Sequence, residues 1–173
     1  MSNAPVLEME RLILREHRPA DLNAYQSLWT VPEVIRFTSG QPMNREQAWS
    51  RIMLFRGMWE LLGFGMWLIE EKATGEVVGE AGLQDRRREI EPSLDGMIEA
   101  GWIFLPRMHG KGFAREAMEA VFSWADSAHP GAAYCCIIDP ENLASLKLAE
   151  RLGFAEPLRT SYKDHPTVIL RRS

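Results

Sequence analysis

The segment 97–114 constrains the fold and the chemistry of this chain more than any other. An apolar stretch, 97–105, leads into a loop that contains Gly110 and Gly112, and residues with helical periodicity follow. This order predicts a strand, a tight loop and an amphipathic helix. The first N–H groups of a helix have no partner inside the helix and lie at the positive end of its dipole, so they bind anions. Glycine lets the backbone approach a ligand closely because it has no Cβ. The segment therefore predicts a site for a phosphate-bearing cofactor.

Two other phosphate-binding motifs do not fit this segment. A Walker loop requires Gly-x-x-x-x-Gly-Lys followed by Ser or Thr, whose hydroxyl holds magnesium. Here Gly112 follows Lys111, and the first glycine of that motif is missing. A dinucleotide-binding fingerprint requires a third glycine and an acidic residue after a second strand, and the segment fits neither requirement.

Composition narrows the class of protein. The chain has 173 residues, of which 46% are hydrophobic and 25% charged, and its formal net charge is -4. These values are ordinary for a globular protein, so we predict a single domain over 1–173 with a short tail at 1–5. General nucleic-acid binders usually carry a basic surplus, so we expect no nucleic-acid partner. The mildly acidic balance suits a cationic or amine substrate.

The sequence also predicts the cellular compartment. We see no stretch of the roughly 20 apolar residues that a bilayer span requires and no signal peptide, so we expect no membrane partner. The two cysteines, Cys135 and Cys136, are adjacent in an apolar stretch. Neighbours on a strand point to opposite faces, so we interpret them as reduced, buried residues of a cytoplasmic protein.

Hydrophobic periodicity and turn residues predict alternating elements. We predict strands at 6–15, 66–71, 77–83, 97–105, 132–138, 154–162 and 167–171. We predict helices at 19–29, 44–62, 114–130 and 142–152, with a short helical piece at 32–37. Asn44 and Gln47 have the spacing of a capping box at a helix start. The charged loop 85–95 contains three consecutive arginines, Arg86 to Arg88, which we interpret as a solvated surface rather than a binding patch.

Four motifs carry a resemblance to a known family. The spacing Arg107-x-x-Gly110-x-Gly112, after a strand and before a helix, resembles the acyl-CoA pyrophosphate loop of the GNAT superfamily of N-acetyltransferases. Three further motifs occur in that family's order, namely Met9-Glu10-Arg11-Leu12-Ile13-Leu14-Arg15, Gly75-Glu76-Val77-Val78-Gly79, and Asn142-x-x-Ser145 followed by Leu152-Gly153-Phe154. The resemblance covers nearly the whole chain and points to the branch of ribosomal-protein-alanine acetyltransferases (RimJ/RimL type).

The resemblance implies an α/β fold with a mixed, twisted central sheet of about seven strands flanked by about four helices. The sheet should splay between strands 97–105 and 132–138, and acetyl-CoA should enter that cleft like an extra strand. The implied activity is transfer of the acetyl group to a primary amine, of a protein N-terminus or a small molecule, by direct attack in a ternary complex. The residues implied to contact acetyl-CoA are Ile103, Phe104, Leu105, Arg107, Met108, His109, Gly110, Lys111, Gly112, Phe113, Ala114, Asn142 and Ser145.

Two catalytic residues follow from the same resemblance. Glu99 is a lone carboxylate in an apolar strand, where partial burial would raise its pKa, and the family position before Gly101-Trp102 is often given the role of general base. A carboxylate that pairs with a core cation is the equal alternative. Many relatives place a tyrosine seven residues after the asparagine, but this chain has Ala149. Ser145 is then the candidate acid, although an ordinary helix-surface serine is equally consistent.

The remaining polar residues have weaker assignments. Arg107 and Lys111 add positive charge to the loop or are merely solvated, and we interpret His109 as loop surface without a metal partner. Asn142 caps a helix, contacts the pantetheine arm, or does both. Tyr162 is a further candidate to reach the cleft. We expect acetyl-CoA and an amine as partners, no metal, and a monomer or homodimer. The missing tyrosine at Ala149 keeps a second hypothesis open, a domain that binds acyl-CoA without catalysis.

Overall fold

A computed structural model describes residues 4–173 and shows one open sheet of eight strands with helices on both faces. The strand order is β1-β2-β3-β4-β5-β6-β8-β7. Every neighbouring pair is antiparallel except β5 and β6, which are parallel. Of the predicted tail, positions 1–3 lie outside the described residues, and the carbonyl of Pro5 accepts a hydrogen bond of 2.8 Å from the Trp67 indole. The predicted α/β architecture with a mixed central sheet is confirmed.

The strands lie where the alternating pattern predicts them, with one correction. They are β1 (Leu7–Glu8), β2 (Leu12–Arg15), β3 (Met66–Glu71), β4 (Val77–Gln84), β5 (Ile98–Phe104), β6 (Tyr134–Ile138), β7 (Ala155–Tyr162) and β8 (His165–Arg172). The prediction of a single strand over 6–15 is wrong, because the chain turns between Met9 and Leu12 and pairs Leu7 with Leu14. This hairpin accounts for the eighth strand.

The helices begin and end at residues whose chemistry explains their bounds. They are α1 (Leu22–Leu28), α2 (Pro32–Ile35), α3 (Arg45–Leu62), α4 (Phe113–Ala128) and α5 (Leu143–Arg151), with short 3-10 turns at Pro19–Asp21 and Pro106–Met108. At the start of α3, Asn44 and Gln47 satisfy each other's backbone N–H groups, as the capping box predicts. Gly63 ends α3 with a φ of +74°, a left-handed conformation that glycine adopts at low cost.

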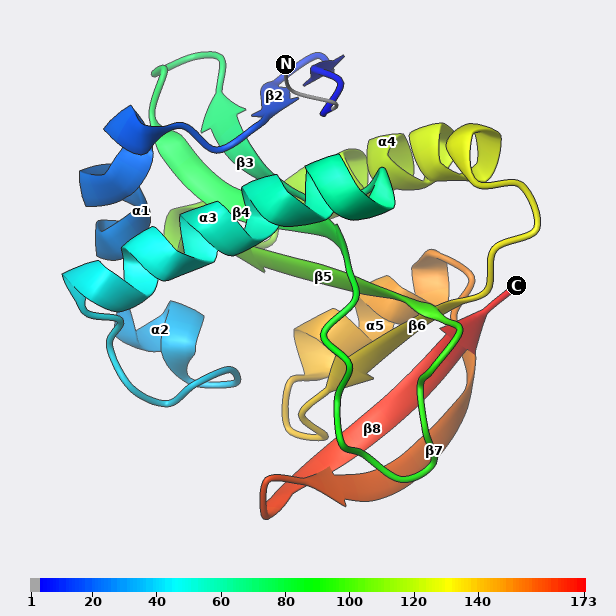
Figure 1. Ribbon diagram of the computed structural model, residues 1–173. Coiled ribbons are helices and arrows are strands. Elements are labelled where there is room, and N and C mark those ends of the chain that lie inside the picture. The colour runs from blue at the N-terminus through cyan, green and yellow to red at the C-terminus, as the bar shows by residue number, and fades with distance from the viewer. Residues whose placement is uncertain (1–3) are drawn as a thin grey trace.

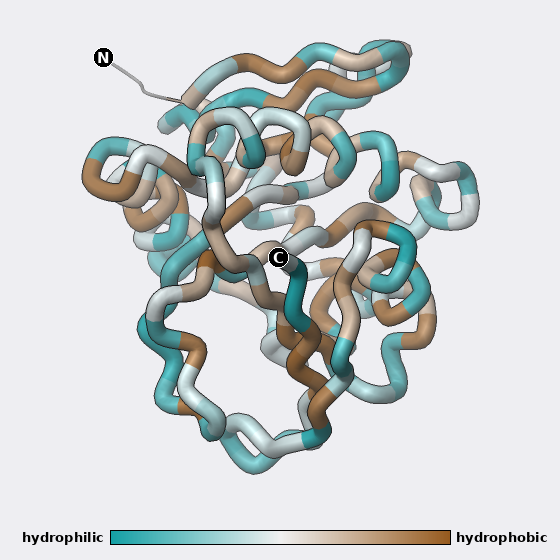
Figure 2. Tube along the Cα trace, turned by 90° about the vertical axis from the view of Figure 1, so that its right-hand side faces the viewer, coloured by the Kyte–Doolittle hydropathy of each residue, from teal (hydrophilic) through white to brown (hydrophobic). Residues whose placement is uncertain are grey.

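Residues of β3 alternate between two apolar layers, which places helices on both faces of the sheet. Trp67 and Ile69 belong to the larger core with α4, and Leu68 belongs to the core formed by α1, α2 and α3. Figure 1 shows α3 in front of the sheet and α4 behind it. Figure 2 shows that hydrophobic and hydrophilic residues alternate along much of the trace and that the outermost turns are mainly hydrophilic. No helix within 4–173 is long and apolar enough to cross a membrane.

The long loop between β4 and β5 is held against the sheet. Ile90 and Leu94 of this loop pack with Cys135 and Ile169 in a separate apolar cluster. The Thr160 hydroxyl donates a hydrogen bond of 2.7 Å to the carbonyl of Glu91. The loop is therefore a fixed part of the surface near the N-terminal ends of β5 and β6, where the two strands pair.

Candidate active site

The parallel strands β5 and β6 separate soon after they meet. Only two residue pairs connect them, Ile98 with Tyr134 and Glu99 with Cys135. Beyond these pairs β5 continues to Phe104 beside β4, and β6 continues to Ile138 beside β8. The predicted splay between these strands is present, and the backbone edges that face it are available to a ligand that enters as an extra strand.

The glycine loop has the geometry that anion binding requires. Gly110 and Gly112 adopt φ values of +73° and +80°, in the left-handed region that L side chains rarely enter. A Cβ on Gly110 would have no neighbour within 4 Å, so the backbone there borders open space. The first helical hydrogen bond of α4 runs from Glu116 N–H to the Gly112 carbonyl, which leaves the N–H groups of 113–115 without a partner inside the helix.

Side chains hold this loop in place from both ends. Arg107 pairs with Glu71 at 2.8 Å and with Glu76 at 2.7 Å, two carboxylates that flank the β3–β4 turn. These hydrogen bonds lower the pKa of the Glu71 carboxyl. Lys111 donates from Nζ to the Arg107 carbonyl, and His109 shares a hydrogen bond of 3.0 Å with the carbonyl of Phe104. In the structure all three side chains brace the loop itself.

Arg11 is a brace that the sequence did not predict. Its Nε donates to Glu116 at 2.6 Å, its guanidinium also donates to the Lys111 carbonyl at 2.9 Å, and it stacks 4.0 Å from the centre of the Phe113 ring. Glu116 lies in the first turn of α4, so this ion pair neutralises a carboxylate close to the candidate anion site. The only sequence signal was the position of Arg11 within the first family motif.

The other residues predicted to contact the cofactor fall into two groups. The side chains of Phe104, Met108 and Phe113 are buried in the core, so only their backbone can face the loop. Leu105 and Ala114 are half-buried and pack against the same core, and Ile103 lines the cavity described next.

A cavity of about 600 Å³ lies beside the splayed strands. Its walls come from the segment after α2, from α3, from β4 and β5, from the loop after β4, from the start of α5 and from the β7–β8 turn. Gly101, Trp102 and Ile103 of β5 line it on one side, and Ile137 and Ile138 of β6 line it on the other. The cavity therefore joins the splay to a pocket large enough for a second substrate.

Glu99 lines this cavity, but both of its oxygens are engaged. Arg88 donates to Oε2 at 2.6 Å and to Oε1 at 2.7 Å, and Gln84 donates to Oε1 at 2.9 Å. Burial opposes the charge of Arg88, yet the hydrogen bonds to Glu99 outweigh it and raise the pKa of the guanidinium. The interpretation of Arg86 to Arg88 as solvated surface is therefore wrong for Arg88, whose side chain is 18% exposed.

A second carboxylate, Glu80 on β4, lies in the same cavity and was missed by the sequence analysis. Glu80 is fully buried. Its Oε1 accepts a hydrogen bond of 2.8 Å from the Tyr25 hydroxyl and lies 2.9 Å from His17 Nε2, while Arg51 lies 3.7 Å from Oε2. Oε2 has no hydrogen-bond partner within the described chain. Burial and the nearby Glu80 charge raise the pKa of Tyr25, which keeps its hydroxyl protonated as a donor.

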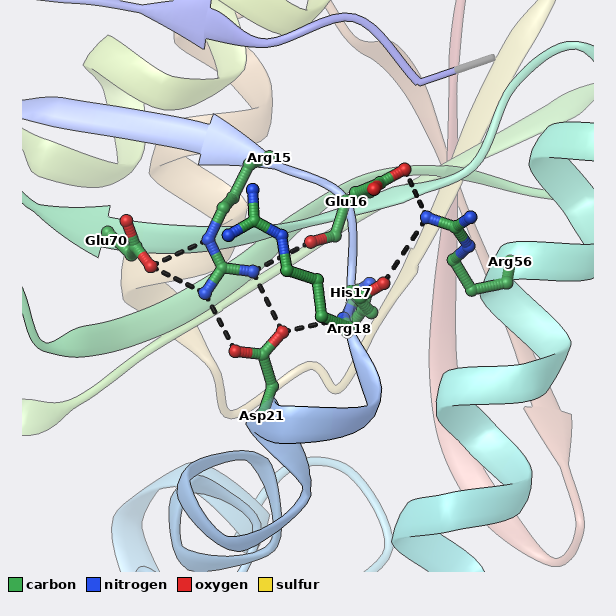
Figure 3. A network of polar contacts seen from close by, with 7 residues as sticks. All are labelled: Arg15, Glu16, His17, Arg18, Asp21, Arg56 and Glu70. Carbon is green, nitrogen blue, oxygen red and sulfur yellow. Dashed lines mark hydrogen bonds and ion pairs between the residues drawn. The ribbon is translucent and has the colours of Figure 1, made fainter. Parts of the chain in front are cut away.

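An ion-pair network fixes the segment that carries His17 (Figure 3). Arg15 is buried and makes two hydrogen bonds of 2.8 Å with Asp21 and one of 2.7 Å with Glu70. Arg56 of α3 pairs with Glu16 and donates to the His17 carbonyl at 3.5 Å. The connection from β2 to α1 is thereby held in one conformation, which places His17 and Tyr25 next to the Glu80 carboxylate.

At the other side of the cavity, Asn142 and Ser145 lie at the start of α5. The Asn142 side chain accepts a hydrogen bond from the Ser145 N–H at 3.2 Å, so it caps the helix as predicted. The Ser145 hydroxyl accepts a hydrogen bond of 3.2 Å from the Trp102 indole across the splay. Tyr162 also lines the cavity, and the Arg88 guanidinium lies 5.3 Å from its ring centre.

Burial determines the chemistry of the two cysteines. Cys135 and Cys136 are free and buried, and burial together with Glu99 raises the pKa of Cys135 to about 12. A thiol with such a pKa is a poor nucleophile at neutral pH. Within residues 4–173, no group of three or more His, Cys, Asp or Glu side chains could hold a metal ion.

Comparison with known proteins agrees with this geometry. A family model described as "Acetyltransferase (GNAT) domain" matches residues 11–155. The Bacillus subtilis protein named "Uncharacterized N-acetyltransferase YoaA" is 30% identical over 155 residues, which cover 87% of this chain and 82% of that protein. The chain spans about half the length of another Bacillus subtilis relative, the uncharacterized protein YkkB, at 32% identity.

Solved structures share the whole fold. A GnaT-family acetyltransferase from Bordetella pertussis superposes with a TM-score of 0.88 at 30% identity, covering 98% of this chain and 99% of that one. RimL, a ribosomal L7/L12 alpha-N-protein acetyltransferase solved with coenzyme A, superposes with a TM-score of 0.78 at 14% identity, covering 97% of each chain.

Proposed function

Because this chain belongs to the GNAT family of acetyltransferases, we propose that it moves the acetyl group of acetyl-CoA to a primary amine. The amine attacks the thioester directly while both substrates are bound. The observation that supports this most is the splay of β5 and β6 next to a glycine loop at the start of α4. Aligning an amine with a thioester can contribute up to roughly 7–11 kcal/mol to lowering the barrier, so no covalent intermediate is required.

The residues around the splay fit the chemistry of acetyl-CoA. The partnerless N–H groups at the start of α4 suit a pyrophosphate, and the exposed backbone edges of β5 and β6 suit the amides of a pantetheine arm. In our proposal the contacts run along Ile103 to Leu105, Arg107 to Ala114, Asn142 and Ser145. Acetyl-CoA supplies the activated acyl group, and the protein supplies position and polarisation.

Two carboxylates in the cavity receive different roles. Both oxygens of Glu99 already accept hydrogen bonds from Arg88 and Gln84, so in our proposal it anchors Arg88 rather than accepting a proton. Glu80 has one oxygen without a hydrogen-bond partner, and we assign it as the acceptor of the amine proton, directly or through one water molecule. This replaces Glu99, the general-base candidate of the sequence analysis, whose equal alternative was a carboxylate paired with a cation.

Ser145 is assigned to the leaving thiolate. The indole of Trp102 donates to its oxygen, which orients the hydroxyl at the mouth of the splay. A hydroxyl that already accepts one hydrogen bond is free to donate one, so Ser145 can stabilise the developing thiolate by a hydrogen bond, and the thiolate takes up its proton from water as coenzyme A leaves.

The test is release of free coenzyme A thiol from acetyl-CoA in the presence of a panel of primary amines. We expect amine-dependent release and an acetylated product detectable by mass spectrometry. Acetyl-CoA binding without thiol release for any amine would instead support the non-catalytic acyl-CoA-binding domain.

A further inference from the structure

The pocket next to the splay carries a surplus of positive charge. Its lining includes five cationic side chains, Arg36, Arg51, Arg86, Arg88 and Lys163, and three acidic ones, Glu80, Glu99 and Asp139. The chain as a whole has a formal net charge of -4, so the positive charge at this pocket is local. Within the lining, Arg88 is already neutralised by Glu99.

Arg51 is presented to the cavity from a slot of aromatic rings. Its guanidinium lies 4.2 Å from the centre of the Trp29 ring and 5.2 Å from that of Phe55. Its nearest carboxylate oxygen, Oε2 of Glu80, is 3.7 Å away, and its buried Nε has no hydrogen-bond partner within 4–173. Stacking fixes the plane of the guanidinium while most of its donors stay available.

The positive charge of Arg86 is compensated by nearby carboxylates even less than that of Arg51. In the described part of the chain it makes no hydrogen bond or ion pair, although it lines the cavity. Arg86 is an exposed residue at the edge of the cavity, where partial desolvation and the neighbouring guanidinium groups of Arg51 and Arg88 lower its pKa. Because Arg88 is paired with Glu99, the guanidinium groups of Arg51 and Arg86 are the ones that an anion bound in the cavity would stabilise.

We propose that the amine acceptor carries an oxyanion, a carboxylate or a phosphate, which Arg51 and Arg86 bind while the amine faces Glu80. The planar donor fork of arginine matches both groups, because each presents two oxygens to paired N–H donors. This inference rests on the proposed function and names the acceptor class for it: a primary amine with an oxyanion a few bonds away.

Binding of inorganic phosphate tests the subsite without any turnover. The protein is first saturated with coenzyme A, which occupies the glycine loop, and thermal stability is then measured against phosphate at constant ionic strength. We expect phosphate to raise the Tm of the wild type and of Arg87→Gln, but not of Arg86→Gln. Arg87 is the matched control because it neighbours Arg86, pairs with Asp85 and is 72% exposed. The inference is overturned by no shift in the wild type, or by an equal shift in Arg86→Gln.

Paired acceptors then separate phosphate from carboxylate. We compare ethanolamine with phosphoethanolamine, and an α-amino acid amide with the free amino acid. One charge-assisted contact corresponds to about a tenfold preference in kcat/KM, which Arg86→Gln should remove and Arg87→Gln should keep. A preference for phosphoethanolamine over ethanolamine identifies the anion as a phosphate, and a preference for the free amino acid over its amide identifies it as a carboxylate. Equal turnover within both pairs contradicts the inference. Failure to bind acetyl-CoA would instead overturn the proposed function.

Discussion

The two halves of the cleft are built in different ways. The half assigned to the donor centres on one continuous segment, from the end of β5 into α4, which the edge of β6 and the start of α5 complete, and it faces the ligand mainly with backbone groups. The half assigned to the acceptor is made of side chains from α1, α3, β4 and the loop after β4, and its polar groups face one another across the fold. The first depends on conformation at a few glycines, and the second depends on the identity of side chains.

This difference implies that the acceptor can change while the donor site is kept. A backbone site keeps its ligand as long as the loop keeps its shape, whatever the surrounding side chains are. A side-chain site changes its ligand with a single substitution. Substitutions in the two halves should therefore separate acetyl-CoA affinity from turnover, and the following predictions test that separation.

The largest effect is expected for Gly110→Val. A β-branched residue at a φ of +73° is strained and points a side chain at the loop's ligand face, so we expect acetyl-CoA affinity to fall by about 100-fold or more. Gly131→Val is the control, because Gly131 has a φ of +79° and equally open space but lies after α4. Calorimetric titration should show a loss of acetyl-CoA affinity for Gly110→Val but not for Gly131→Val. Equal affinities would refute backbone recognition by the loop.

The next effect is expected for Glu80→Gln. Removal of a general base typically costs about 100-fold or more in kcat, while acetyl-CoA affinity should stay near that of the wild type. Glu99→Gln is the comparison variant. It should lower the free energy of unfolding, because Arg88 loses its partner, but it should lower kcat less than Glu80→Gln does. Steady-state kinetics over a pH range separates the two variants. If Glu99→Gln loses more kcat than Glu80→Gln, the roles are reversed.

A smaller effect is expected for Asp21→Asn. Burial opposes the charge of Asp21, but hydrogen bonds from Arg15 and Arg18 outweigh it and lower the pKa of the carboxyl. Its contribution is therefore present above the unfolded pKa of about 3.9 and is lost as pH falls through the lower folded value. We expect a loss of about 1–3 kcal/mol in unfolding free energy at neutral pH, with acetyl-CoA affinity kept. Denaturation at several pH values measures it, and a difference that does not shrink as the pH falls below the unfolded pKa would contradict the assignment.

The smallest effect is expected for Arg107→Ala. Arg107 pairs with Glu71 and Glu76 at the surface, where such pairs contribute about 0–1 kcal/mol. Acetyl-CoA affinity should fall only a few-fold, and less at high salt. A loss as large as that of Gly110→Val, measured in the same titration, would show that the donor half also depends on a side chain.

The donor half could be predicted from the sequence because its signals are local. Gly110 and Gly112 mark the loop, and a strand and an amphipathic helix flank them within one segment. The capping box at Asn44 is local in the same way, since both partners lie within four residues. Such features depend on backbone conformation, which neighbouring residues determine.

The acceptor half could not be predicted because its contacts are long-range. Glu80 is a lone carboxylate in an apolar strand, the same signal that singled out Glu99, but its partners lie 63 and 55 residues away at His17 and Tyr25. The arginine run looked solvated because nothing in its own sequence shows that Glu99 faces Arg88. The β1–β2 hairpin looks like one strand in the sequence because the turn is short: only two residues lie between Met9 and Leu12, whose backbone groups close it.

The most direct test of the two-part cleft is the change in backbone amide chemical shifts when acetyl-CoA is added to the labelled protein. We predict that the largest changes lie at Gly110 to Arg115 and along the facing edges of β5 and β6. The amides of Arg86 and Arg87 should move little until an acceptor is added. Changes confined to the arginine-lined pocket, with the loop unaffected, would contradict the assignment of the glycine loop to the donor.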